Sequence, residues 1–252
     1  MFFSHLSRFL IVFGFGGFSA CAALSQGLLG TEQPFESASA LVVPMGATQI
    51  EAGGWLEWAT PEGEQVEDFS YAVPLGIIRY GFRERIEVRV GAQFSQSLGQ
   101  AETARAGLKW DIVPDADRFR VAWISEIETR LSSISTKTRA PSNHRMCATW
   151  TDEERWSARA NWGVRWGADS TEMVVTAAAA REVGWQGWTV FLEPVWRSTT
   201  GLRMHAGALL EVGDDAQVDV AFQRDLDSGD LRFTFGYSRR LWRMEESAQT
   251  EP

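Results

Sequence analysis

The stretch RYGFRERIEVRVGAQF, residues 79–94, ends in strict alternation between apolar and polar side chains. One set of alternate residues is apolar: Ile86, Val88, Val90, Ala92 and Phe94. The set between them is charged, polar or small: Glu87, Arg89, Gly91 and Gln93. A period of two predicts a β-strand with two unlike faces. In a soluble sheet the apolar face packs inward, whereas in a transmembrane barrel it faces lipid and the polar face lines the lumen.

The same alternation recurs along the chain, in segments separated by turn residues. It predicts strands at about 48–58, 69–80, 86–94, 102–112, 119–129, 146–151, 156–166, 172–181, 188–197, 202–212, 216–224 and 231–242. An even number of strands is typical of bacterial outer-membrane barrels. After the N-terminus no run of about 20 apolar residues occurs, and this excludes a helical membrane protein.

The connections between these strands differ in length at the two predicted ends. One end carries the short turns GFRER, PDADR, DEE, EVGWQG and GDDA. The other end carries PEGEQVED, SQSLGQAE, SSISTKTRAPSNHR (132–145), GADSTE and DLDSGD. Short periplasmic turns and longer outer loops are the asymmetry of outer-membrane barrels, which a soluble sheet has no reason to show.

Aromatic residues support the same orientation. The chain has 12 Trp and 15 Phe beside only 3 Tyr, and indoles favour the boundary between lipid and water. Near the predicted inner rim lie Trp150, Trp156, Trp188 and Trp242, and near the outer rim lie Trp58, Trp166 and Trp196. We therefore predict an all-β fold, an antiparallel up-and-down transmembrane β-barrel of about 12 strands. A shift of the strand register by one residue would point Glu87 and Arg89 at the hydrocarbon core of the membrane, at a cost of about 1–4 kcal/mol for each charge.

The N-terminus predicts export. His5 and Arg8 precede the apolar run FLIVFGFGGF, and small residues follow it, as in a signal peptide. We predict a signal peptide at 1–25, a periplasmic segment at 26–45, an outer-membrane barrel at 46–242 and a C-terminal tail at 243–252. Lipoprotein processing at Cys21 is the alternative. Only Cys147 then remains, so no internal disulfide is expected, and barrel-insertion machinery and outer-membrane lipid are the expected partners.

Charges of both signs fall on the predicted inward face. The expected lumen-lining residues are Glu51, Glu57, Glu87, Arg89, Arg105, Lys109, Arg159, Arg165, Glu193, Arg197 and Arg232. They would either form a polar track that orients a solute or pair across strands and fill the lumen. About twelve strands enclose a narrow interior, between the filled eight-stranded barrels and the open 16-stranded porins.

Other kinds of chemistry find little support in the sequence. A net charge of −9 and a pI near 5.0 argue against nucleic-acid binding. No phosphate-binding glycine loop or metal-ligand spacing occurs, so no cofactor or metal is expected. A lipid hydrolase would need a nucleophile beside a histidine. The available candidates are Ser142 and His144 in the predicted 132–145 loop, His205 on the inward face, and Cys147 close to His144.

Several stretches together resemble one known family. QPFESASALVVPMGATQIEAGGWLEW is similar to the N-terminal segment and first strand of the meta-pathway phenol-degradation transporters, through Pro34, Pro44, Gly46, Gln49, Glu51 and Gly53. PLGIIRYGFRERIEVRVG resembles their second hairpin, through Pro74, Arg79, Tyr80, Gly81, Glu87, Arg89 and Gly91. TVFLEPVW and MHAGALLEVGDDAQVDVAF resemble their late strands, through Glu193, Gly207 and Asp219. The likeness covers most of residues 33–241.

This resemblance implies an exported outer-membrane barrel that passes small hydrophobic or aromatic solutes. The chain departs from the family by continuing past Trp242 with RMEESAQTEP, which leaves the insertion signal FGYSRRLW slightly internal. We therefore expect a transporter and not an enzyme. A structural or adhesive barrel with a plugged lumen, acting through the 132–145 loop, is the alternative, and a lipid hydrolase is a second one.

Overall fold

The structure of the protein, a computed structural model, describes residues 31–32, 36–59, 68–95, 103–113, 118–130, 140–152, 155–167, 170–184 and 187–242. The predicted signal peptide and C-terminal tail lie outside these residues. Within the described ranges, no helix is long and apolar enough to cross a membrane.

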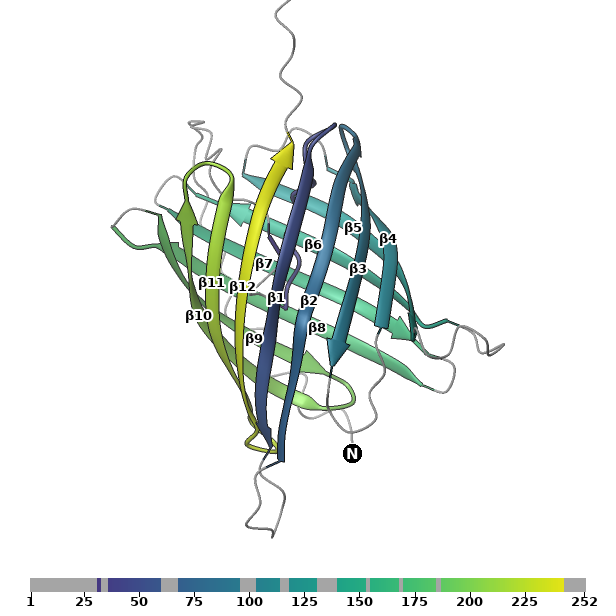
Figure 1. Cartoon of the computed structure of the whole chain (residues 1–252), viewed down its shortest axis with the longest axis vertical. Coiled ribbons are helices and arrows are strands. Elements are labelled where there is room, and N and C mark those ends of the chain that lie inside the picture. Colours follow the sequence, from purple (N-terminus) through teal and green to yellow (C-terminus); the bar gives the residue numbers. More distant parts are fainter. Residues whose placement is uncertain are drawn as a thin grey trace, which may run out of the picture.

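Antiparallel strands form one closed barrel in chain order (Figure 1). They are β1 Thr48–Ala59, β2 Asp68–Arg83, β3 Ile86–Ser95, β4 Thr103–Asp111, β5 Phe119–Arg130, β6 Ser142–Thr151, β7 Trp156–Trp166, β8 Thr171–Glu182, β9 Trp188–Arg197, β10 Gly201–Val212, β11 Ala216–Asp225 and β12 Leu231–Trp242. β1 pairs with β12 and closes the sheet, so no strand edge remains among these twelve. The predicted fold class is confirmed.

Two predicted boundaries are wrong by three residues or more. β2 continues to Arg83 rather than ending near residue 80, so only residues 84–85 remain between β2 and β3. β6 begins at Ser142 rather than near residue 146, because residues 142–145 pair with both neighbours, as in Asn143 with Glu126 of β5 and Arg165 of β7. The predicted loop 132–145 is shorter by these four residues. Ser-Asn-His-Arg carries no apolar alternation, because this end of β6 contributes polar side chains to both faces.

The barrel is apolar on the outside and polar on the inside. Outward side chains in the middle of the strands are large, apolar and exposed: Val90 is 54% exposed, Leu108 52% and Trp162 54%. The inward Glu87 and Glu193 are 0% exposed. Because no soluble protein benefits from exposing so much apolar surface, the outward face is suited to lipid.

Six of the outward tryptophans lie near the two ends of the barrel, whereas Trp162 lies in the middle of β7. Trp58, Trp150, Trp156, Trp166, Trp188 and Trp196 are between 37% and 48% exposed. Trp58, Trp166 and Trp196 lie at or near the final residues of β1, β7 and β9, while Trp150, Trp156 and Trp188 lie at the opposite end. These places fit two aromatic girdles, and anchoring by them stays a prediction. The side chain of Trp242 is outside the described part.

We call the end that carries 84–85, 112–118, 152–155, 183–187 and 213–215 the turn end, and the opposite one the loop end. The loop end carries the long connections 60–67 and 131–141. The predicted separation by length is only partial, because 198–200 at the loop end is as short as 213–215 at the turn end.

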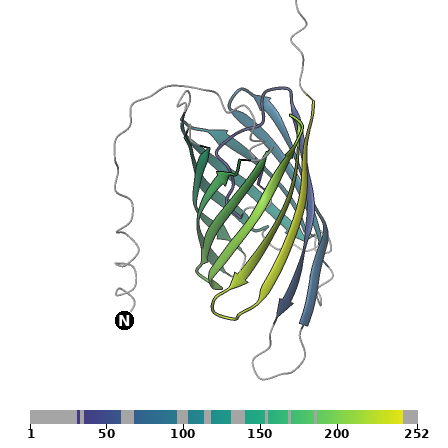
Figure 2. The same ribbon diagram turned by 90° about the vertical axis from the view of Figure 1, so that its left-hand side faces the viewer.

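Residues 31–32 and 36–45, which we call the plug segment, lie inside the barrel (Figure 2). The chain then leaves the lumen at the turn end, where Met45 bridges to Gly81 and Gly46 takes a positive φ of 77° before β1. A Cβ on Gly81 would lie 2.0 Å from the Pro44 carbonyl oxygen, so this crossing requires glycine. Residues 26–45 were predicted as a periplasmic segment, and the position of the plug segment inside the barrel was not predicted.

Candidate functional site

A group of buried charges on β1, β2 and β3 forms one side of the lumen. Arg79 donates from Nη1 to Glu51 Oε1 at 2.7 Å, and from Nε and Nη2 to the Glu87 carboxylate at 2.7 and 2.8 Å. It also donates to the carbonyl oxygen of Leu41 at 3.2 Å. Alternation on neighbouring antiparallel strands brings these side chains to one patch, and all three charged groups are at most 1% exposed.

Glu32 of the plug segment reaches the next part of the same wall. Its carboxylate accepts from both Nη atoms of Arg89 and lies 3.7 Å from Lys109 Nζ. Its backbone N–H donates to Glu51 Oε2 at 3.0 Å. Arg89 also lies 3.0 Å from Glu126, so a single arginine joins the plug segment to the wall.

Glu36 of the plug segment makes the contacts nearer the loop end. Arg197 Nη2 donates to Glu36 Oε2 at 2.7 Å, and Arg145 Nη1 donates to the Glu36 carbonyl oxygen at 3.2 Å. The backbone N–H groups of Glu36 and Ser37 donate to the two oxygens of Glu193 at 2.9 and 2.7 Å. Glu193 is buried beside His205, whose Nδ1 lies 2.9 Å away.

The carboxylates of Glu32 and Glu36 are held in the ionised form. Burial alone would raise the pKa of each, but the neighbouring cations act in the opposite direction and more strongly in sum. Arg89 and Lys109 lower the pKa of Glu32, and Arg197 lowers that of Glu36, in both cases well below the usual range. Because the pKa of both carboxylates is lowered, these ion pairs are fully formed above the ordinary glutamate pKa, and mild acid does not break them.

The backbone between these points is held by polar side chains of the wall. Ala38 exchanges two hydrogen bonds with the Asn161 amide, at 2.7 and 2.9 Å. Ala40 donates to Thr149 Oγ1 at 2.8 Å, and Val43 donates to Glu87 Oε2 at 2.9 Å. Altogether the plug segment bonds to side chains of β1, β2, β3, β4, β6, β7, β9 and β11, so it crosses the lumen.

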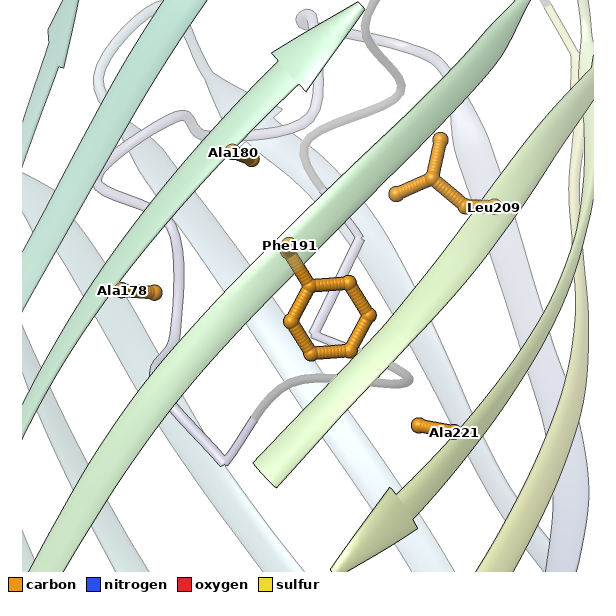
Figure 3. Close-up of a cluster of buried hydrophobic side chains, with 5 residues drawn as sticks. All are labelled: Ala178, Ala180, Phe191, Leu209 and Ala221. Carbon is orange, nitrogen blue, oxygen red and sulfur yellow. The ribbon is translucent and has the colours of Figure 1, made fainter. Parts of the chain in front are cut away.

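Opposite the charged wall, the lumen has an apolar patch. Figure 3 shows its five side chains, which come from β8 to β11: Ala178, Ala180, Phe191, Leu209 and Ala221. The ring of Phe191 meets the edge of His205 with centroids 5.3 Å apart. The sequence analysis missed this patch, because the run AAAA at 177–180 places alanine on both faces and shows no alternation.

Buried polar atoms without a protein hydrogen-bond partner border this patch. On β10 to β12 they include His205 Nε2, both carboxylate oxygens of Asp219, Gln223 Nε2 and Thr234 Oγ1, counting only residues that the structure describes. In a sealed core each such group would cost about 1–3 kcal/mol. Such atoms also occur elsewhere in the described part of the lumen, as at Lys109 Nζ and Thr176 Oγ1, so they do not single out this wall.

The predicted lumen residues divide by their exposure. Six are buried: Glu51, Glu87, Arg89, Lys109, Arg159 and Glu193. Four are half-buried: Glu57, Arg105, Arg197 and Arg232. Arg165 is exposed and pairs with Glu128 at 2.9 Å. Arg232 pairs with Glu57 across strands, which is one of the two expected roles, whereas Arg89 and Arg197 hold the plug segment, a role that was not predicted. Orientation of a solute by these residues stays a prediction.

The plug-binding residues Asn161, Thr149, Gln217 and Arg145 were not among the predicted site residues, and neither was Arg79. Arg79 shares its inward face with Ile77, which is 2% exposed, so a charged inward face is not evident from that strand. For the others, the only available signal was polarity on the inward face. Their partners lie more than 100 residues away in the chain, as in Ala38 with Asn161.

The hydrolase candidates are not brought together. Ser142 and His144 lie on β6, not in a loop, and the ring of His144 lies between Trp123 and Trp166, with centroids 6.1 and 5.1 Å away. His205 lies in the lumen against Glu193. The two histidines therefore each have a structural contact of their own.

Cys147 offers a test of the plug segment. It is 0% exposed and packs in one cluster with Ala38 and Ala40 of the plug segment. We expect its thiol to resist a water-soluble maleimide in the folded protein and to react on unfolding, since buried thiols are inert. A Thr200→Cys variant, on the exposed 198–200 connection, is the control and should label at once. Peptide mass mapping separates the sites, and fast labelling of Cys147 in the folded protein would contradict its burial.

Comparisons with known proteins place the fold. No protein-family model matches the chain, and no curated protein matches its sequence. The KdgM porin superposes with a TM-score of 0.58 at 8% identity, over 77% of this chain and 99% of that one. The NanC porin does so with a TM-score of 0.58 at 8% identity, over 76% and 100%. The chain therefore has the fold of outer-membrane porins, and its resemblance to phenol-degradation transporters rests on the sequence stretches alone.

Proposed function

We propose that the protein is an outer-membrane channel for small solutes, closed internally by the plug segment. The observation that carries this proposal is how the segment is held: its contacts are mainly hydrogen bonds and ion pairs to the wall. Water can replace such contacts at a net cost of about 0.5–1.5 kcal/mol for each neutral hydrogen bond and about 1.5–3 kcal/mol for each one to a charged group, and most of the contacts here are of the second kind. The apolar side chains that it packs against Cys147 are only the small Ala38 and Ala40.

The solutes in this proposal are small and include hydrophobic or aromatic molecules. The apolar patch around Phe191 and Leu209 supports this class, because it offers a ring and an aliphatic side chain inside an otherwise charged lumen. Asp219 and Gln223 beside it would hydrogen-bond polar groups of the same solute. The KdgM porin has been solved in complex with disordered oligogalacturonate, and passage of any solute by the present chain is part of the proposal.

A specific observation favours a second function. The plug segment bonds to strands all around the lumen, from β1 to β11, as a permanent closure would. The second candidate is therefore a structural or adhesive barrel with a plugged lumen, which would present its loop end to the outside. The two candidates differ in whether the segment ever leaves its place.

Conductance in planar bilayers tests the proposal. The double variant Glu32→Gln/Glu36→Gln keeps the shape of both side chains and removes the charges that pair with Arg89 and Arg197. We expect rare single-channel steps in the wild-type protein and frequent ones in the variant, with flux of small solutes into liposomes. A gel before and after boiling first establishes that both proteins are folded. Folded proteins without steps or flux would instead support the structural barrel.

A further inference from the structure

We propose that Arg197 is a binding site for the carboxylate of a small organic acid, and that the plug segment's own Glu36 occupies this site in the closed protein. Binding of such an acid from the loop end would displace Glu36 and open the lumen. This inference rests on the proposed channel function and names the class of solute that controls it.

Arg197 differs from the other arginines near the loop end. Arg203 and Arg232 each pair with a carboxylate of an adjacent strand, and Arg165 pairs with Glu128 of β5, two strands away in the wall. Arg197 also has such a wall partner, Glu172 at 3.2 Å, yet its shorter contact, 2.7 Å, goes to Glu36 on a segment that is not part of the sheet. A guanidinium has a fork of five donors suited to carboxylates, so it can take a free acid in the same place.

The ion pair of Arg197 with Glu36 is more accessible than the deeper pair of Arg89 with Glu32. The side chains of Arg197 and Glu36 are 21% and 22% exposed, whereas those of the deeper pair, Arg89 and Glu32, are 2% and 15% exposed. Arg197 is the last residue of β9, at the loop end. An acid that arrives from that end meets Arg197 before it could reach Arg89.

The apolar patch around Phe191 lies close to the site at Arg197. Glu193 accepts from the backbone of Glu36 and contacts His205, and the ring of Phe191 lies against His205. Two residues thus separate the carboxylate position from the apolar patch. An acid with an apolar body could place that body toward Phe191, which would help it compete with Glu36. It needs such help, since a tethered carboxylate acts at a high effective concentration.

Glu36 holds the segment near its middle. Besides the ion pair, Arg145 donates to its carbonyl oxygen and Glu193 accepts its N–H. Displacing the side chain removes the ion pair and leaves these two backbone contacts, so it loosens the stretch from residue 36 to residue 40 without releasing it. Ala38 and Ala40, which cover Cys147, belong to that stretch.

The test uses the full-length protein in planar bilayers, with benzoate added at the loop end and benzyl alcohol as the neutral probe of similar shape. We expect benzoate to raise the open probability of the wild type roughly tenfold, within the usual range for two coupled sites, and benzyl alcohol to have no effect. Glu36→Gln should be open without benzoate and should not respond to it.

Glu172→Gln is the matched control, because it removes the other carboxylate on Arg197 and leaves the plug segment intact. It should stay closed alone and respond to benzoate as the wild type does, because Glu36 and benzoate gain equally from the loss of Glu172. Labelling of Cys147 gives a second readout: benzoate should speed it in the wild type and benzyl alcohol should not.

Failures of the two proposals are distinguishable. If Glu36→Gln conducts but benzoate changes neither the conductance nor the labelling of the wild type, the carboxylate site is wrong and the channel stands. Equal responses to benzoate and benzyl alcohol would also overturn it. If folded wild type, Glu36→Gln and the double variant all fail to conduct, the channel itself is wrong.

Discussion

Replacing Arg79 by methionine should lower the free energy of unfolding by about 3–5 kcal/mol, the usual cost of removing one partner from a buried ion pair. Arg79 is 1% exposed and is the cation between Glu51 and Glu87, both 0% exposed. Without it the two carboxylates would lose the cation that they share, and Glu87 would keep Arg89 only at 4.0 Å. It also bonds to Leu41, so the plug segment loses a contact at the same time.

Urea titration of the barrel refolded into lipid vesicles, followed by tryptophan fluorescence, measures this change. Arg203→Met is the control, since Arg203 pairs with Asp225 at 2.8 Å but is 18% exposed. There the loss should be about 1 kcal/mol or less, because backbone N–H groups of residues 227 and 228 still bond to Asp225. Adding Glu51→Gln and Glu87→Gln to Arg79→Met should recover part of the stability. Equal losses at Arg79 and Arg203 would show that the central charges are solvated.

The barrel could be predicted from sequence because its signal is local. In β7, residues 156–166, every second side chain faces lipid, and the observed limits equal the predicted ones. A strand that faces two different solvents must alternate, so each segment carries the information about its own orientation. The prediction failed where the rule does not apply, at residues 142–145, because polar side chains there serve both faces.

The plug segment could not be predicted for the opposite reason. The sequence of residues 31–45 has no hydrophobic period. The described part of this segment lies inside the lumen with wall on all sides, so it has no apolar and polar faces that would alternate. Its partners are single polar side chains on distant strands, such as Asn161 and Glu193. The sequence does not show whether Glu193 binds backbone N–H groups or pairs with an arginine. The charges were expected on the inward face, but their division between wall and plug segment depends on the closed structure.

The closed structure also shows how opening could leave buried cations paired. Two of the cations that hold the plug segment also touch a carboxylate of the wall, as Arg89 does with Glu126 and Arg197 does with Glu172. If the segment leaves, these two arginines keep a partner, so opening does not leave either of them as an uncompensated charge. A lumen built in this way can exist in two states, and this is the property that a closure inside a channel needs.

Val90→Arg should destabilise the barrel by about 2–4 kcal/mol, the depth-dependent cost of arginine at the middle of a lipid-facing strand. Val90 lies at the centre of β3, points outward between Ile78 and Ala106, and is 54% exposed. Val212→Arg is the matched control, because Val212 is 49% exposed but ends β10 at the turn end. Near the interface the cost of arginine falls to about 0–1 kcal/mol.

Urea titration in vesicles compares the two valine variants directly, since both add the same charge to an exposed position. A soluble sheet with a wet outer face would tolerate arginine equally well at both. A membrane barrel must distinguish them, because only Val90 lies at the depth of hydrocarbon. Equal stabilities, or a wild-type barrel that stays dissolved in buffer without detergent, would therefore contradict the inside-out polarity on which the channel and its closure both depend.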